Sequence, residues 1–214
     1  MPLLYLAFLL VILVVILQLG IFSIALAKLG LSPNSAVLLL CCTLFGSLVN
    51  LRLFSINSSF RNIPENFPFP RALIRPAHFQ KGKTIIALNV GGALIPVSFS
   101  FYLIMLHTID LLHLIVAIFT VSTISYSFSR PIKGLGIGMP VLIAPITAAF
   151  SALIIDPEHS APLAYICGTL GVLIGADLLR LKDIKQMGVP SAAIGGAGTF
   201  DGIFFTGIIA VLLA

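Results

Sequence analysis

The sequence predicts an all-α fold, a polytopic integral membrane bundle of about seven transmembrane helices. Hydrophobic residues make up 59% of the 214 residues and charged residues only 9%, whereas about a quarter of the residues of an average soluble domain are charged. Apolar runs of about 20 residues, the length that crosses a bilayer as a helix, follow one another along the chain. Seven such runs with short loops use nearly the whole length, so we expect a single transmembrane domain over residues 1–214.

Hydropathy and turn signals set the bounds of the expected helices. They are residues 3–26, 36–53, 84–106, 111–128, 137–155 and 162–179, followed by a seventh helix that ends at Ala214. Glycine and proline interrupt several of them, as at Gly91, Gly92 and Pro96. Membrane helices tolerate such breaks where neighbouring groups satisfy the freed backbone, so we expect the breaks to be buried.

The positive charges orient this bundle. Eleven of the twelve lysines and arginines fall on one side of a seven-helix topology, and Lys28 alone falls on the other. Lysine and arginine collect in cytoplasmic loops. We therefore expect a multi-pass protein of the cell membrane with its N-terminus inside and its C-terminus outside.

Residues 55–83 differ from the rest of the chain. Four prolines in this span exclude a transmembrane helix, and five lysines and arginines lie among them. We expect a basic cytoplasmic loop at the surface of the lipid bilayer, either a solvated loop that only sets the topology or one that binds anionic lipid headgroups. No basic stripe with interleaved aromatic residues occurs in the sequence, which argues against a nucleic-acid partner.

Two aspartates in apolar helices are the candidate catalytic residues, Asp177 and Asp201. An ionised carboxylate costs about 2.5–3.5 kcal/mol at the centre of a membrane helix, so an acid in such a place indicates a function. The apolar neighbours of Asp177 favour its neutral acid form, whereas a position at the start of a helix favours the carboxylate of Asp201. The two residues could then act as general acid and general base.

Other polar and small residues fall at the same depth, in the cytoplasmic half. The candidate binding residues, which we expect to line one cytoplasm-facing cavity with the aspartates, are Asn50, Asn89, Gly91, Gly92, Gly195, Gly196 and Gly198. In the alternative interpretation, Asp177 pairs with Arg180 and Asp201 only stabilises a helix start. Gly171 and Gly175 form a small-xxx-small patch that predicts close helix packing.

These residues leave three functions open, and with them the question whether the protein is an enzyme. The favoured function is metal-independent hydrolysis of a membrane-embedded peptide by the two aspartates around a shared water. The second is proton- or ion-coupled transport of a small solute, because interrupted helices and intramembrane acids also serve transport. The third is a structural or partner-binding role without catalysis.

No cofactor and no metal is expected at the aspartate pair. The chain offers no glycine-rich phosphate loop, and peptide hydrolysis by two carboxylates needs neither. A second polar group on the opposite side of the membrane could hold a cation such as zinc, although short interfacial loops collect polar residues in any case. Its members are His107, Asp110, His113, Asp156, Glu158 and His159.

Three motifs carry a family resemblance. At Asn89-Val90-Gly91-Gly92-Ala93-Leu94-Ile95-Pro96, at Gly175-Ala176-Asp177-Leu178-Leu179 and at Ile194-Gly195-Gly196-Ala197-Gly198-Thr199-Phe200-Asp201-Gly202-Ile203-Phe204, the chain resembles the domain of unknown function 1614 family of prokaryotic membrane proteins. The resemblance covers most of the chain. It implies a polytopic membrane protein and no particular activity.

The two aspartate-bearing helices are also similar to those of the presenilin and signal-peptide-peptidase type of intramembrane aspartyl protease. Those enzymes place one aspartate on a helix that enters the cytoplasmic side and the second, in Gly-x-Gly-Asp, on the next helix. The resemblance implies a catalytic pair at Asp177 and Asp201. Here Thr199 and Phe200 separate the glycine from Asp201, which departs from that pattern.

Overall fold

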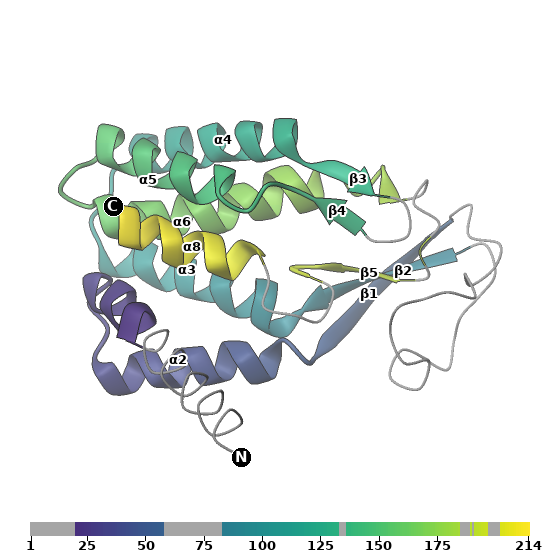
Figure 1. The fold of residues 1–214 in the computed structure, drawn as a ribbon, viewed down its shortest axis with the longest axis horizontal. Coiled ribbons are helices and arrows are strands. Elements are labelled where there is room, and N and C mark those ends of the chain that lie inside the picture. The colour runs from purple at the N-terminus through teal and green to yellow at the C-terminus, as the bar shows by residue number, and fades with distance from the viewer. Residues whose placement is uncertain (1–19, 58–82, 133–135, 185–188, 190, 197–201) are drawn as a thin grey trace, which may run out of the picture.

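The computed structural model describes residues 20–57, 83–132, 136–184, 189, 191–196 and 202–214. These residues are mostly helical, and the helices lie side by side (Figure 1). The strands gather at one end of the bundle, which we call the strand end. At the opposite end, the corner end, the chain turns from one helix to the next at residues 107–110 and 156–159.

The described helices run from Gly20 to Leu213. They are the segment Gly20–Lys28, α2 (Pro33–Gly46), the π-helical η1 (Val90–Leu94), α3 (Ile95–Leu106), α4 (Leu111–Phe128), α5 (Ile143–Ile155), α6 (Ser160–Val172), the π-helical η2 (Leu173–Leu178) and α8 (Gly202–Leu213). Side chains cap three of their starts: that of η1, where Oδ1 of Asn89 accepts from the N–H of Gly92, and those of α2 and α4. Ser32 accepts a hydrogen bond from the N–H of Ser35 before α2, and Asp110 accepts one from the N–H of Leu112 before α4.

Two helices of the described residues are long and apolar enough to cross a membrane. They are α4 and the continuous pair of α6 and η2, residues Ser160–Leu178. The segment Gly20–Lys28 and α2 would make a third span if they were counted together, but they are bent by 112° against each other. The apolar helices α5, α8 and η1 with α3 are shorter. Helix length therefore supports two or three crossings here, and the seven predicted crossings are not established.

The predicted all-α fold is wrong in one respect, because strands accompany the helices. β1 (Asn50–Asn57), β2 (Lys83–Asn89) and β5 (Ser191–Ile194) form a sheet in the order β1-β2-β5, in which β1 pairs antiparallel and β5 parallel with β2. β3 (Arg130–Ile132) and β4 (Gly136–Gly138) form a separate antiparallel hairpin. Hydropathy cannot separate a short apolar strand from the end of a helix, so three predicted helices had absorbed strand residues.

The corrected helix bounds follow from these strands. The predicted second helix ends at Gly46, since Ser47 closes it by donating its hydroxyl to the carbonyl of Leu44 at 2.7 Å. The predicted third helix begins as β2 and η1, and the predicted fifth helix begins only at Ile143. The fourth helix has its predicted bounds, residues 111–128. Of the predicted basic loop 55–83, residues 58–82 lie outside the described residues.

A β-bulge gives the sheet one apolar face. The register leaves Leu53 unpaired between the pairs Arg52–Ala87 and Phe54–Ile86. One extra residue shifts the alternation of side chains, so Phe54 joins the face of the fully buried Ile86. The residues buried with Ile86 are Ala93, Ile184, Val189 and Ile194.

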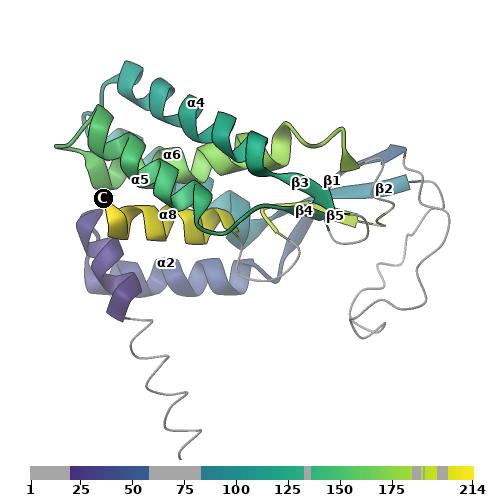
Figure 2. The same cartoon turned by 45° about the horizontal axis from the view of Figure 1, so that its top comes forward.

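α6 is the central helix of the bundle and packs on α3, α4, α5 and α8 (Figure 2). Its contact with α4 is close because glycines face α4. A Cβ atom on Gly171 would lie 2.6 Å from Cβ of Val121, and one on Gly175 would overlap the backbone of Ser122. These contacts confirm the predicted role of the two glycines in helix packing.

Candidate functional site

Asp177 lies near the end of η2, at the strand end of the central helix. Its Oδ2 accepts a hydrogen bond from the backbone N–H of Gly195 at 2.9 Å, and its side chain is partly buried. A π-helical turn adds a residue to the helix and redirects the side chains around it, and such turns are frequent at functional sites. Asp177 is thus held toward the turn that follows β5.

Gly195 and Gly196 form that turn in conformations that favour glycine. Their φ angles are +80° and +105°. A Cβ atom on Gly195 would lie 2.5 Å from Cβ of Ala93 and 2.7 Å from its backbone N. Because Ala93 belongs to η1, the turn is wedged between the two π-helical segments, and only glycine fits there.

Asn89 joins η1 to the end of α2. Its Nδ2 donates to the carbonyl of Ser47 at 2.7 Å and to Oδ1 of Asn50 at 3.0 Å, while its Oδ1 accepts from the N–H of Gly92 at 2.7 Å. The side chain is buried, and both amide hydrogens are used within the protein. Asn89 therefore holds the local backbone together and has no N–H left to offer a ligand.

The glycines of η1 allow this close approach. A side chain on Gly91 would overlap the backbone of Thr43, Gly46 and Ser47 at the end of α2. Gly92 supplies the N–H that Asn89 accepts, and its backbone carbon lies 2.8 Å from the Cβ position of Gly195. Gly91 thus allows η1 to pack closely on the end of α2, and Gly92 contributes its N–H to the cap at Asn89.

Most of the predicted site residues lie within this one connected group. The contacts run from Asp177 through Gly195, Gly92 and Asn89 to Asn50. The group lies where β1, β2 and β5 meet the helices, at the strand end (Figure 1). Two predicted members, Gly198 and the candidate catalytic residue Asp201, lie outside the described residues.

The described residues on either side of Asp201 touch the surroundings of Asp177. Before Asp201, Gly195 donates to the Asp177 carboxylate. After it, Ile203 at the start of α8 is buried in one cluster with Ala176 and Val172. The chain that carries Asp201 is therefore attached to the Asp177 region at both of its described ends.

The alternative in which Arg180 pairs with Asp177 is wrong. Arg180 forms its ion pair with Asp183 at 3.0 Å, and its guanidinium donates to the carbonyls of Tyr126 and Ser129 at 2.8 and 2.9 Å. It also stacks over the ring of Tyr126, 4.2 Å from the ring centre. Arg180 thus caps the C-terminal end of α4, a role that sequence spacing could not reveal because the partners are about fifty residues away.

At the corner end, Asp156 collects part of the second polar group. His159 donates its backbone N–H to Oδ1 at 3.1 Å, and the Nδ1 atoms of His159 and His113 lie 3.2 and 3.6 Å from Oδ2. Burial by itself would raise the pKa of Asp156, but the hydrogen bonds and charge of His159 outweigh burial and hold this pKa below its usual value. Within the described part of the chain, no three His, Cys, Asp or Glu side chains are arranged to hold a metal ion.

The fold and the site together define a helical membrane protein with a small sheet at one end. The sequence matches the family described as "Protein of unknown function (DUF1614)" over residues 44–213, and the chain belongs to this family. This match confirms the family resemblance carried by the three motifs. No curated protein and no solved structure matches the chain.

Proposed function

We propose that this chain is a multi-pass protein of the cell membrane that hydrolyses a membrane-embedded peptide with Asp177 and Asp201. The observation that carries the proposal is the double attachment described above. Gly195, six residues before Asp201, binds the Asp177 carboxylate, and Ile203, two residues after it, packs against Ala176. Because Asp201 is only two residues from Ile203, at most about 7 Å of chain, this attachment favours a short distance between the two acids.

The proposed reaction divides two proton transfers between the aspartates. The Asp201 carboxylate takes a proton from a water molecule as the water oxygen attacks the carbonyl carbon of the peptide bond. Protonated Asp177 gives its proton to the departing amide nitrogen, so the C–N bond breaks and an acid and an amine result. The N–H of Gly195 orients Asp177 by binding Oδ2, which leaves Oδ1 to carry the transferable proton.

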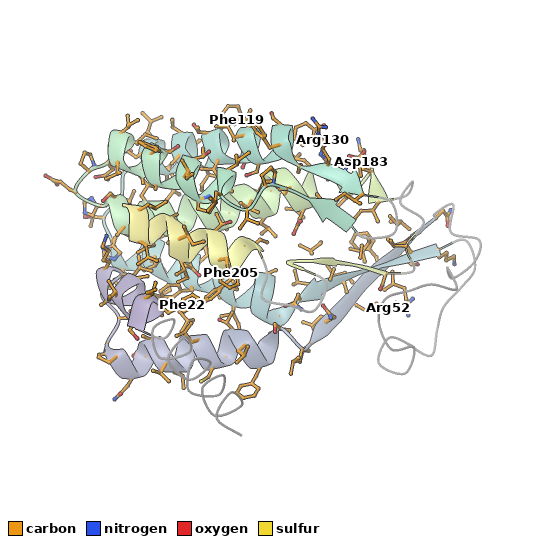
Figure 3. The ribbon with its side chains drawn as sticks, viewed as in Figure 1. Phe22, Arg52, Phe119, Arg130, Asp183 and Phe205 are labelled. Carbon is orange, nitrogen blue, oxygen red and sulfur yellow. The ribbon has the colours of Figure 1, made fainter. Side chains whose placement is uncertain are left out.

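The orientation in the membrane is part of the proposal. The described basic residues of the strand end are Arg52, Lys83, Arg130, Arg180 and Lys182, and Figure 3 shows Arg52 and Arg130 there together with Asp183. The corner end carries Asp110, Asp156 and Glu158. Since positive charge collects on the cytoplasmic side, the strand end faces the cytoplasm, with seven crossings and the N-terminus inside.

Cysteine labelling tests this orientation. In a chain from which Cys41, Cys42 and Cys167 have been removed, Lys182→Cys should react only after the membrane is opened. Glu158→Cys should react in intact cells with a reagent that cannot cross the membrane. The reverse labelling pattern would refute the orientation, and it would say nothing about the proposed hydrolysis.

The hydrolysis is tested with the purified chain in vesicles that contain a transmembrane peptide carrying a fluorophore and a quencher on either side of its midpoint. Asp177→Asn and Asp201→Asn should each reduce cleavage about a hundredfold or more, since general acid–base catalysis contributes factors of about 10²–10⁴. Glu158→Gln, an exposed carboxylate-to-amide change at the corner end, is the matched control and should cleave normally. Cleavage that survives either aspartate change would rule out the pair.

Ion-coupled transport is the second candidate, because η1 and η2 interrupt their helices beside Asp177. Vesicles loaded with a pH-sensitive dye distinguish it from hydrolysis. A proton flux that is lost in Asp177→Asn, with the reporter peptide left intact, would favour transport. Normal growth and protein level after both aspartate changes, with neither cleavage nor flux in the unchanged chain, would favour a structural role.

A further inference from the structure

A strip of apolar side chains continues from α2 into β1 and remains exposed. Its members, which we call the interfacial strip, are Leu48, Val49, Leu51, Leu53 and Phe54, each between 44% and 74% exposed. The strip follows directly on the exposed Leu44 and Phe45 of α2. It ends at polar residues, because Ser55 and Asn57 occupy the far part of β1.

The length of α2 explains where this strip lies in a bilayer. At about 1.5 Å per residue, the 14 residues of α2 span about 21 Å. The hydrocarbon core is about 30 Å thick. Residues 47–49 turn after α2, because the N–H groups of Leu48 and Val49 donate to the carbonyls of Phe45 and Gly46. At about 1.5 Å per residue this turn adds about 4–5 Å, and one or two residues of β1 at about 3.3 Å each cover the rest of the remaining distance of about 9 Å. If α2 starts at the membrane surface of the corner end, its continuation reaches the opposite surface close to Leu51.

The bulge at Leu53 keeps one face of the interfacial strip apolar beyond Leu51. Without the bulge, Phe54 would turn to the face that carries Asn50 and Arg52. With it, Leu51 and Phe54 lie on the same face of the sheet, at the margin that the buried cluster around Ile86 does not cover.

Arg52 supplies a charge in the middle of the strip. Its side chain is exposed and lies on the other face of β1 from Leu51 and Phe54. A long basic side chain flanked by apolar ones suits the boundary between acyl chains and headgroups, where the charge reaches the phosphate and the apolar atoms stay among the lipid tails.

We propose that the interfacial strip is a membrane-contact surface, in which Leu51, Leu53 and Phe54 enter the acyl-chain boundary of the leaflet at the strand end while Arg52 binds an anionic lipid headgroup. The sheet is then seated on the membrane and is not a domain held in water. This proposal does not depend on the hydrolysis. Three observations support the bilayer over a second copy of the chain: the strip continues the exposed face of α2, the depth calculation places the membrane surface within the strip, and the strip carries a basic residue.

A tryptophan reporter tests the proposal, because the chain contains no tryptophan. Phe54→Trp is placed in the full chain and reconstituted into vesicles of phosphatidylcholine and phosphatidylglycerol, with and without phosphatidylcholine brominated near the headgroup end of its acyl chains. Asn57→Trp, on the exposed polar end of β1, is the matched water-facing control. Phe119→Trp, on the outward side of α4 in Figure 3 and 71% exposed, is the lipid-facing control.

The Phe54→Trp emission should shift to shorter wavelength and lose most of its intensity to the brominated lipid, whereas Asn57→Trp should stay red-shifted and respond only to acrylamide. Emission of Phe54→Trp that matches Asn57→Trp would overturn the proposal. Shielding of Phe54→Trp from both quenchers would overturn it in favour of a protein contact. More phosphatidylglycerol should deepen the quenching, and Arg52→Gln should abolish that dependence. A dependence unchanged in Arg52→Gln would refute the role of Arg52.

Discussion

The carboxylate of Asp177 and the backbone of Gly195 are joined by one hydrogen bond of 2.9 Å, and the same glycine packs against Ala93 in η1. A single residue without a side chain therefore positions an acid on one helix relative to the interrupted start of another. A hydrogen bond between neutral groups contributes about 0.5–1.5 kcal/mol, and this one ties η2 to the turn after β5.

Gly195→Ala should destabilise the protein for two separable reasons. The φ of +80° costs an L residue about 1–2 kcal/mol, and the overlap with Ala93 costs about 1–3 kcal/mol more. Gly30→Ala is the matched control, because Gly30 has φ of +81° but nothing within 4 Å of its Cβ position. Unfolding in detergent micelles, followed by helical circular dichroism, should show the larger loss for Gly195→Ala, and equal losses would contradict the packing described here.

Asn89→Ala should reduce the free energy of unfolding by several kcal/mol. It leaves the N–H of Gly92 and the carbonyl of Ser47 without their partner, at about 1–3 kcal/mol for each buried group. Asn57→Ala, at an exposed position of β1, should change stability by less than about 0.5 kcal/mol. Denaturant titration of both variants makes the comparison, and a small effect at Asn89 would show that water replaces its hydrogen bonds.

Arg180→Lys should destabilise the protein although both side chains carry a positive charge. A lysine cannot bind the carbonyls of Tyr126 and Ser129 together with Asp183, since it lacks the planar fork of the guanidinium. We expect a loss of about 1–3 kcal/mol in unfolding experiments and faster hydrogen exchange at the end of α4. Arg130→Lys, at an exposed position of β3, is the control and should behave as the unchanged chain.

Asp156 should make stability depend on pH in the acid range. Because its pKa is lowered in the folded protein, its contribution is present above the unfolded value of about 3.8 and is lost as the pH falls through the lower folded value. The melting temperature should therefore drop below pH 4. Asp156→Asn should be less stable than the unchanged chain at pH 7, and its melting temperature should fall less on acidification. Melting temperatures of the two proteins that fall equally with pH would show that Asp156 does not cause the pH dependence.

The sequence predicted the helical part of the fold well where apolar length alone decides it. α4 begins at Leu111 and ends at Phe128 as expected, because Asp110 caps its start and no glycine or proline interrupts it. The strands were missed because Ile85 and Ile86 are as apolar as the helix residues that follow them. Their pairing with β1 and β5, from distant parts of the chain, is a tertiary effect that a local pattern does not contain.

The candidate site, too, could be predicted only in part from the sequence. The sequence predicted that Asn50, Asn89, Gly195 and Asp177 lie close together, and the structure brings these residues into one connected group. The prediction had placed both asparagines on helices, whereas they lie on β1 and β2. The role of Asn89 could not be predicted, because its partner Ser47 lies forty-two residues earlier and contributes only a backbone carbonyl. The outward direction of Arg180, toward α4, likewise depends on contacts that spacing does not encode.

The helices α4 and α6 are held together at both of their ends. Arg180, just beyond η2, binds the last carbonyls of α4, and at the opposite end Asp156, before α6, lies against His113 of α4. Contacts at both ends, together with the close packing of Gly171 and Gly175 on α4 between them, restrict sliding and separation of the two helices. These two helices therefore form a fixed frame, and we expect relative motion of the helices to occur in those packed around this frame.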